Sequence, residues 1–238
     1  MTVIIALIAV MLVSAFPHQQ IATAGVDNGY AGKKAKYVFF FIGDGMGMPQ
    51  VNAAEIFKGT LESENKMHKG KLGFTVFPNQ GMQTTHSNNT FITESAAAGT
   101  ALATGQKTNN DILGMDATKT VKLKTMAEMA KEKGMKVGIV SNVSIDHATP
   151  GAFYAHEPTR KNYYEIGLAL VYGTYEPFSV TVTHILNQKA GIGWTTYAHT
   201  GVAIPVFAQG IGGELFQGYY DNTDIAKKIM NIMGVKQQ

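Results

Sequence analysis

Residues 93–105 read Thr-Glu-Ser-Ala-Ala-Ala-Gly-Thr-Ala-Leu-Ala-Thr-Gly. This stretch predicts a helix that begins at Ser95, and Gly105 is a typical C-terminal stop. Because most of its side chains are small, we expect another element to pack closely against it. A serine that opens a helix is most often its N-cap, so Ser95 by itself indicates little about chemistry.

An apolar run, Tyr37–Ile42, lies upstream and ends at Gly43-Asp44-Gly45. Such a run is typical of a buried parallel strand with a polar residue at its C-terminal tip. Ligand sites in open α/β sheets gather at that end of the strands. The sequence therefore predicts that Asp44 lies at a functional edge of the sheet.

Helix and strand patterns alternate downstream of this region. Residues Thr125 to Lys133 predict a helix stopped by Gly134, and Met135 to Val140 predict the next buried strand. The loop at the end of that strand is Ser141 to Pro150. A helix, a glycine and an apolar strand form half of a βαβ unit. The predicted fold class is therefore α/β.

The pattern changes after residue 170. Residues Val171 to Thr183 have no clear period, and His184 to Ala190 predict a short helix. Residues Ile204 to Ala208 predict a strand. A last helix is expected over Asp224 to Met233, with Asn222 or Thr223 as its cap. Upstream, residues 58–71 predict a surface excursion and 73–85 predict one or two short strands.

Length and composition favour one globular domain. The chain has 238 residues, of which 45% are hydrophobic, and a net charge of +3. Its lysines are scattered, which argues against a nucleic-acid partner. It has no cysteine, so a metal site would have to use Asp, Glu, His, Ser or Thr.

The N-terminal residues predict export. Residues Val3 to Phe16 are almost wholly apolar, and Ala22-Thr23-Ala24 offers a small-x-small cleavage pattern. This run is short for a membrane span, which needs about 20 apolar residues. We expect residues 1–24 to be a signal peptide and 25–238 to be one domain, located in the periplasm or outside the cell. A retained membrane anchor is the alternative.

Five stretches, taken together, resemble the alkaline phosphatase family. They are Phe40 to Gly47, Thr93 to Gly105, His147-Ala148-Thr149-Pro150, His156 to Arg160 and Trp194 to Gly201. The resemblance implies a three-layer α/β sandwich around a mostly parallel sheet. It also implies hydrolysis of phosphate monoesters with zinc and magnesium as cofactors. Members of that family are commonly dimers, so a homodimer stays open.

The resemblance carries roles to individual positions. Asp44 resembles the carboxylate that bridges a zinc and a magnesium, and Thr149 the hydroxyl ligand of the magnesium. Ser95 resembles the nucleophile that becomes phosphorylated, and Arg160 the arginine that holds the substrate phosphate. His199 resembles a zinc ligand. His147 matches the neighbouring position on the metal side, which is Asp or His within the family.

These roles are chemically coherent. A serine hydroxyl needs a base or a metal to become a good nucleophile, and two zinc ions about 4 Å apart hold the attacking and leaving oxygens. The start of a helix at Ser95 adds backbone N–H groups that favour phosphate. The planar fork of Arg160 matches two phosphate oxygens.

The sequence departs from the family at two places. Glu94 stands where the family usually has Asp, so its hydrogen bond to Arg160 is open to a shift. The second departure is larger, because Arg160 and His199 are only 39 positions apart. The long segment that supplies most metal ligands in the family is missing. The sequence therefore predicts an internal deletion near 170–173 and an incomplete sheet.

Counting ligands limits the expected activity. A zinc site needs about three protein ligands, whereas one zinc would keep His199 and the other would keep Asp44 and Ser95. His86, His156 and His184 are further candidates, but their spacing does not argue for recruitment. We therefore expect weak or absent phosphatase activity, with a phosphate-binding or single-metal remnant as the alternative. A phosphomutase or sulfatase is disfavoured by the wording of the serine motif.

Overall fold

The computed structural model describes residues 32–64, 67–173, 176–179 and 199–235. The helices are α1 (Met48–Glu62), α2 (Ser95–Thr104), α3 (Met126–Glu132), α4 (Ala148–Gly151), α5 (Tyr163–Tyr172), the short 3₁₀ helix η1 (Gly213–Phe216) and α7 (Asn222–Met233). The strands are β1 (Asn79–Thr84), β2 (Gly138–Ser141), β3 (Glu176–Ser179), β4 (Ile204–Ala208) and β5 (Gly218–Asp221). The expected signal peptide and the expected helix at His184–Ala190 lie outside the described residues.

The described strands form two separate small sheets. One has the order β4-β1-β5, with β1 antiparallel to β4 and parallel to β5. The other pairs β2 with β3 in parallel, with Gly138 opposite Glu176. Two of the three pairings are parallel, so the α/β class with a mostly parallel but incomplete sheet is confirmed.

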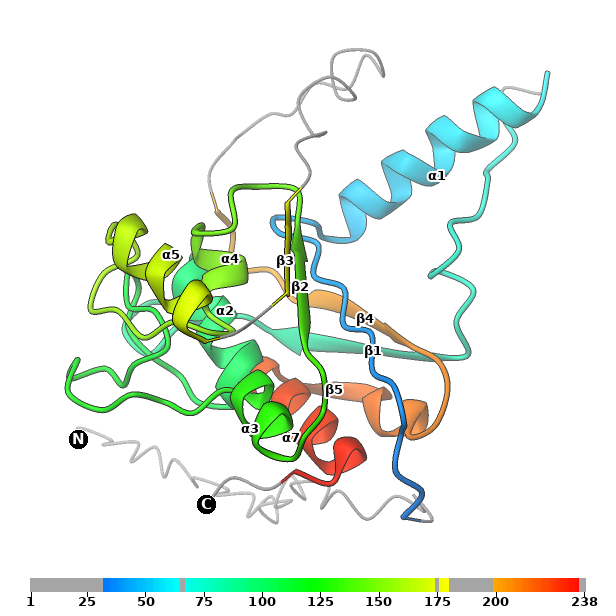
Figure 1. The fold of residues 1–238 in the computed structure, drawn as a ribbon. Coiled ribbons are helices and arrows are strands. Elements are labelled where there is room, and N and C mark those ends of the chain that lie inside the picture. The colour runs from blue at the N-terminus through cyan, green and yellow to red at the C-terminus, as the bar shows by residue number, and fades with distance from the viewer. Residues whose placement is uncertain (1–31, 65–66, 174–175, 180–198, 236–238) are drawn as a thin grey trace, which may run out of the picture.

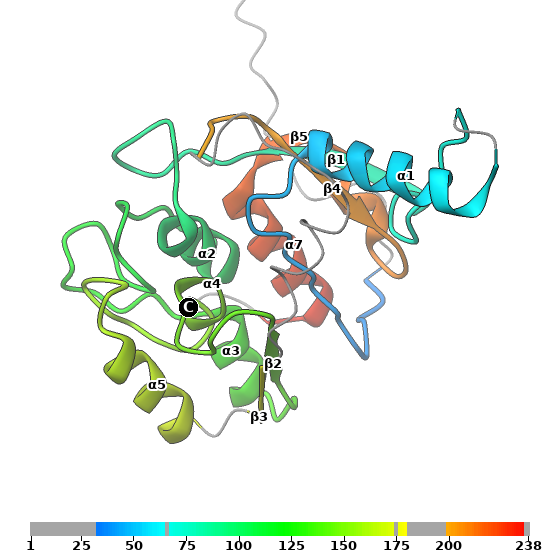
Figure 2. The same cartoon turned by 90° about the horizontal axis from the view of Figure 1, so that it is seen from above.

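The prediction of a buried strand at Tyr37–Ile42 is wrong. This segment (dark blue) runs between the two sheets in Figures 1 and 2, and no described strand pairs with it. Phe40 and Ile42 pack on a core cluster, whereas Tyr37, Phe39 and Phe41 are 70%, 80% and 87% exposed. A strand needs hydrogen-bonded neighbours and two covered faces to become a buried sheet member. Here one face is covered and no ladder forms.

Helix α2 has the predicted bounds and the predicted close packing. It packs against α4 and α7, and Ala96, Ala101 and Ala103 are fully buried. A Cβ atom added at Gly99 would lie only 2.9 Å from the Cβ atom of Ala152 beside α4. Gly105 ends the helix in the left-handed conformation, with φ 74°, that glycine adopts without strain. Small side chains thus bring the N-terminus of α2 close to the start of α4.

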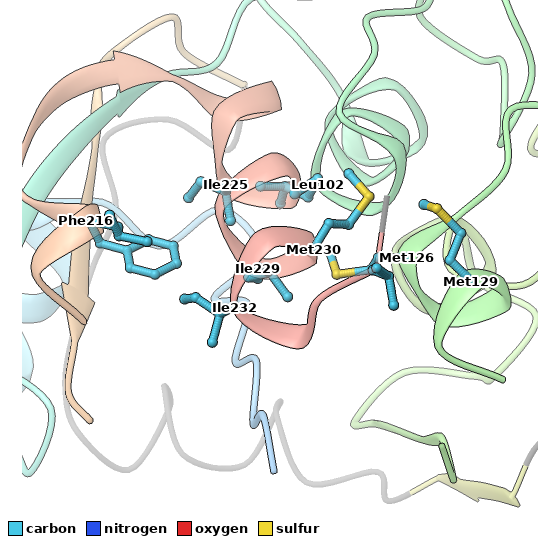
Figure 3. Packing of buried hydrophobic residues seen from close by; sticks show 11 residues of the cluster. Leu102, Met126, Met129, Phe216, Ile225, Ile229, Met230 and Ile232 are labelled. Carbon is cyan, nitrogen blue, oxygen red and sulfur yellow. The ribbon is translucent and has the colours of Figure 1, made fainter. Parts of the chain in front are cut away.

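The core cluster on which Phe40 and Ile42 pack also joins the C-terminal helix to the rest of the chain. Figure 3 shows Leu102 of α2, Met126 and Met129 of α3 and Phe216 of η1 around isoleucines of α7. The cap of α7 differs from the prediction. Asp221 caps it, because its carboxylate accepts hydrogen bonds from the N–H and hydroxyl groups of Thr223 at 3.0 and 2.9 Å.

Element boundaries account for the remaining differences. Helix α3 begins after Thr125, whose hydroxyl and Glu128 form a capping box. Strand β2 begins at Gly138 rather than at Met135, and β4 has the predicted bounds. Helix α1 continues to Glu62, into the expected surface excursion, and projects from the body in Figure 1. Within the described ranges, none of the helices has the length and hydropathy to cross a bilayer.

Candidate active site

Ser95 is the first residue of α2 and not its cap. The N-cap is Glu94, whose carboxylate accepts hydrogen bonds from the N–H groups of Ala96 and Ala97 at 2.9 and 2.8 Å. The usual capping role of a serine is therefore taken by its neighbour. The Ser95 hydroxyl is left to make contacts outside the helix.

Two hydroxyl groups converge on one oxygen of Asp44. Ser95 Oγ and Thr149 Oγ1 each donate a hydrogen bond of 2.9 Å to Asp44 Oδ2. The three residues come from the Gly43–Gly45 turn, the start of α2 and α4. Gly45 adopts φ 65° in that turn, a conformation that a glycine tolerates. Segments far apart in the sequence thus build one solvent-facing cluster of oxygen atoms.

Arg160 lies beside this cluster in an ion pair with Glu94. Its Nη1 atom donates to Glu94 Oε2, and the two side chains are 21% and 13% exposed. Although the sequence leaves this bond open to a shift, the longer Glu94 side chain keeps it while also capping α2. Each terminal nitrogen of an arginine carries two hydrogens, so Nη1 keeps one N–H group that Glu94 does not use.

His147 contacts Arg160 rather than Asp44. Arg160 Nη2 donates to His147 Nε2 at 3.1 Å. Burial lowers the pKa of His147, and the charge of Arg160 lowers it further. Both effects favour the neutral ring, whose Nε2 lone pair accepts this bond. His147 therefore holds the second arm of the guanidinium.

His199 is exposed, and no hydrogen bond or ion pair within the described part of the chain joins it to Asp44, Ser95 or Thr149 of the oxygen cluster. Its neighbour Gly201 approaches Phe91, whose carbonyl oxygen would lie 3.0 Å from an added Cβ atom. The structure thus joins Asp44, Ser95 and Thr149 by hydrogen bonds, and Glu94, Arg160 and His147 likewise, while His199 takes part in neither set among the described residues.

The N–H groups that follow Ser95 at the start of α2 have acceptors within the chain. The N–H groups of Ala96 and Ala97 bind Glu94 Oε2 and Oε1, and that of Ala98 binds the Glu94 carbonyl oxygen at 2.9 Å. A carboxylate on the cap satisfies the donors that a phosphate would otherwise use. The N–H groups of Ala96 and Ala97, which a phosphate at this helix start would otherwise use, are therefore already bonded to Glu94.

The donor set fits magnesium better than zinc. Magnesium takes oxygen ligands, commonly one or two carboxylates with several waters, and Asp44 and Thr149 offer oxygens of this kind at 2.9 Å from each other. Zinc prefers about three protein ligands with nitrogen or sulfur among them. Across the ranges that the structure covers, no group of three His, Cys, Asp or Glu side chains is placed to hold a metal ion. A zinc pair therefore does not fit these residues.

His156 is also committed elsewhere. Its Nε2 atom lies 2.8 Å from Glu128 Oε1, and its Nδ1 atom lies 2.6 Å from the Gly114 carbonyl oxygen. Burial alone would lower the pKa of His156, but these two hydrogen bonds outweigh it and raise the pKa. The charged ring braces α3 against the segment that leads to Arg160.

Sequence reasoning missed Asp111. Its backbone N–H group donates to Glu94 Oε1 at 3.0 Å, and its carbonyl oxygen accepts from the Arg160 N–H group at 2.7 Å. Its φ of 77° is left-handed. The run Asn109-Asn110-Asp111 held the available signal, because Asn and Asp tolerate this conformation better than other side chains.

Comparison with known proteins identifies the family of the chain. The sequence profile of the family described as Alkaline phosphatase matches residues 35–171 and 177–235. The chain belongs to the alkaline phosphatase family.

Curated members of the family match about half of this alkaline phosphatase family chain. Alkaline phosphatase 4 of Drosophila melanogaster is 38% identical over 130 residues, which are 52% of this chain and 22% of the relative. Alkaline phosphatase 4 of Bacillus subtilis is 42% identical over 129 residues, 52% of this chain and 27% of the relative. The match thus spans about a quarter of the length of these relatives.

Solved structures support the same fold. Alkaline phosphatase from the Antarctic bacterium TAB5 has a TM-score of 0.62 at 19% identity, over 82% of this chain and 96% of the other. A cold-active alkaline phosphatase from Shewanella has a TM-score of 0.70 at 17% identity, over 81% and 98%. At such identities the likeness concerns the alkaline phosphatase fold. A TAB5 variant with His replaced by Asp is described with magnesium bound.

The Glu94 ion pair generates a stability prediction. We expect Glu94→Ala to lower the free energy of unfolding by about 3 kcal/mol or more, because it removes a cap and leaves a largely buried guanidinium without its carboxylate. The control is Glu132→Ala, whose pair with Lys124 is exposed and should cost about 0–1 kcal/mol. Urea unfolding of both variants gives the comparison, and equal losses would contradict the role assigned to Glu94.

The Glu128–His156 pair generates a pH prediction. Burial alone would raise the pKa of Glu128, but hydrogen bonds from His156 and the Thr125 N–H group lower it. The stability that Glu128 contributes is therefore complete above the ordinary pKa of a glutamate and is lost as pH falls through the lowered pKa of the folded state. Because the folded pKa of His156 is raised, its contribution is complete below about pH 6.5 and is lost as pH rises through the raised value. The charge of Lys122 opposes the rise.

Glu128→Gln tests this pair, because a glutamine keeps the capping box and removes the charge. We expect the variant to lose about 1.5–3 kcal/mol at about pH 5.5 and clearly less at about pH 9. Glu132→Gln on the same helix is the control, since it should show no such trend. A loss that is equal at both pH values would show that the raised pKa of His156 does not stabilise the fold.

Proposed function

We propose that Ser95 is the nucleophile of a phosphate monoester hydrolysis site that works weakly or not at all in this chain. One observation carries the proposal: the Ser95 hydroxyl is not used as a helix cap but donates to Asp44 Oδ2 at 2.9 Å. A nucleophile in hydrogen-bond contact with a base is the arrangement that covalent catalysis requires.

The proposed reaction has two steps. Ser95 Oγ forms a bond to phosphorus as its proton passes to Asp44, and the P–O bond to the alcohol breaks. The departing oxygen takes up a proton from solvent, to which Asp44 in turn loses its own. Water then hydrolyses the phosphoserine and releases inorganic phosphate. Arg160 holds the phosphate through N–H groups that Glu94 and His147 do not use.

Magnesium is the cofactor that the residues support. Asp44 and Thr149 would hold it, and it would neutralise negative charge beside the phosphate. The magnesium reported with a TAB5 alkaline phosphatase variant is consistent with this proposal. A single oxygen-ligated magnesium is a much smaller assembly than the zinc pair expected for the family.

The weakness of the activity follows from the missing zinc ligands. No trio of His, Cys, Asp or Glu side chains that could hold a metal ion occurs in the portion that the structure describes. We place an internal deletion near residues 170–173 within the domain 25–238. The two segments matched by the family profile are interrupted at 172–176, which supports this position. Tyr172, which ends α5 at this point, is 80% exposed.

The alternative is a non-catalytic remnant that binds phosphate or one metal. It is favoured by Arg160, which is oriented by two partners whether or not a nucleophile can act. In either case we propose export, with residues 1–24 as a signal peptide. The substrate class is phosphate monoesters, and a homodimer is the partner that the family suggests.

A hydrolysis assay tests the proposal. The chain and its Ser95→Ala variant are mixed with zinc and magnesium, and cleavage of a chromogenic phosphate ester is followed at alkaline pH. We expect the turnover rate of the wild-type chain to exceed that of Ser95→Ala by little or nothing. We also expect it to lie far below the roughly 10 per second of a typical enzyme. Rapid turnover that Ser95→Ala abolishes would contradict the proposed weakness.

Phosphate binding forms the second arm of the experiment. Calorimetric titration with inorganic phosphate should show binding that Arg160→Gln weakens at least about tenfold, since a charge-assisted hydrogen bond contributes about 1.5–3 kcal/mol. Lys161→Gln is the matched control because its exposed side chain lies next in sequence. If the wild-type chain shows no turnover and no phosphate binding, both the proposed function and its phosphate-binding alternative are contradicted.

A further inference from the structure

Residues 111–114 form a strut between α2 and the segment that carries Arg160. Gly114 N donates to Thr100 Oγ1 of α2 at 2.9 Å. On the other side, Leu113 and Glu157 exchange backbone hydrogen bonds of 3.0 and 2.8 Å. Ile112 and Leu113 are buried, at 1% and 0% exposure, so the strut is also anchored in the core.

Asp111 stands at the end of this strut and touches both members of the Glu94–Arg160 pair through its backbone. Its N–H group donates to Glu94 Oε1 at 3.0 Å, while its carbonyl oxygen accepts from the Arg160 N–H group at 2.7 Å. One residue therefore fixes the side chain of the acid and the main chain of the arginine at the same time.

The geometry depends on an uncommon backbone conformation. Asp111 and Lys119 are the non-glycine residues with positive φ in the described ranges, at 77° and 61°. Asn and Asp adopt this region several-fold more often than other side chains, whereas a β-branched residue there is strained. The residue type at position 111 consequently decides whether both hydrogen bonds can form together.

We propose that Asp111 is a positioning residue for the phosphate clamp, acting through its left-handed backbone on Glu94 and Arg160. The inference rests on the proposed role of Arg160 in holding phosphate. The Asp111 side chain need not contact the ligand. What matters is that the N–H and carbonyl groups point to the two partners, so that the free N–H groups of Arg160 face the site beside Ser95.

Three substitutions separate backbone conformation from charge. Asp111→Asn removes the charge and keeps the left-handed preference, whereas Asp111→Val removes both. Asp111→Ala is a milder strain that decides the matter if the valine variant does not fold. Lys119→Val imposes the same kind of strain in a surface turn whose contacts are with Asp116, and it controls for loss of stability alone.

The readout is the affinity for inorganic phosphate by calorimetry, together with the urea midpoint. We expect Asp111→Asn to bind within about twofold of the wild-type chain and Asp111→Val to bind about tenfold more weakly, with Asp111→Ala between them. Lys119→Val should lose stability and keep its phosphate affinity.

Two results would overturn the inference while leaving the proposed function intact. One is that Asp111→Ala or Asp111→Val, when folded, binds phosphate as tightly as Asp111→Asn does. The other is a loss of affinity in Lys119→Val as large as that in Asp111→Val, which would reduce the effect to general destabilisation. If the wild-type chain binds no phosphate, the proposed role of Arg160 fails and the inference falls with it.

Discussion

The carboxylate of Glu94 accepts hydrogen bonds from the backbone N–H groups of Ala96, Ala97 and Asp111. It also forms the ion pair with the guanidinium of Arg160. The rest of the site depends on this one group. Because Glu94 caps α2, Ser95 is released from capping and reaches Asp44. Because the same carboxylate binds Arg160, the arginine is held next to the serine. A helix cap, an ion pair and a loop contact are thereby combined in a single side chain that is 13% exposed.

The proposed weakness of the site rests on the ligands that surround the serine. Asp44, Ser95 and Thr149 supply three oxygens, which suits a hard cation such as magnesium. Activation of a serine by a zinc pair needs nitrogen ligands that these segments do not provide. The same shortage is visible in the fold, where Tyr37, Phe39 and Phe41 are exposed and the described strands form two small sheets. The internal deletion that we propose would give the incomplete sheet and the incomplete metal site one origin.

Local rules predicted the parts of the structure that local interactions decide. The bounds of α2, the stop at Gly105 and strand β4 follow from side-chain size, glycine and β-branched runs. The prediction of a strand at Tyr37–Ile42 was wrong because an apolar run forms a buried strand only when it has hydrogen-bonded neighbours in a sheet. The sequence did not predict that Glu94, an uncommon cap, would bind the N–H groups of Ala96 and Ala97 at the start of α2. The role of Asp111 was hidden since a left-handed backbone and two long-range hydrogen bonds leave only a weak trace in the sequence.

The metal content of the purified chain tests the central claim most directly. The chain is equilibrated with zinc and magnesium, freed of loosely bound ions, and analysed by mass spectrometry of its metals. An oxygen cluster without nitrogen ligands should retain no zinc pair, and magnesium should exchange readily because it keeps most of its waters. Two tightly held zinc ions per chain, lost on Asp44→Ala, would contradict the account, since they would require a ligand set that these residues do not form.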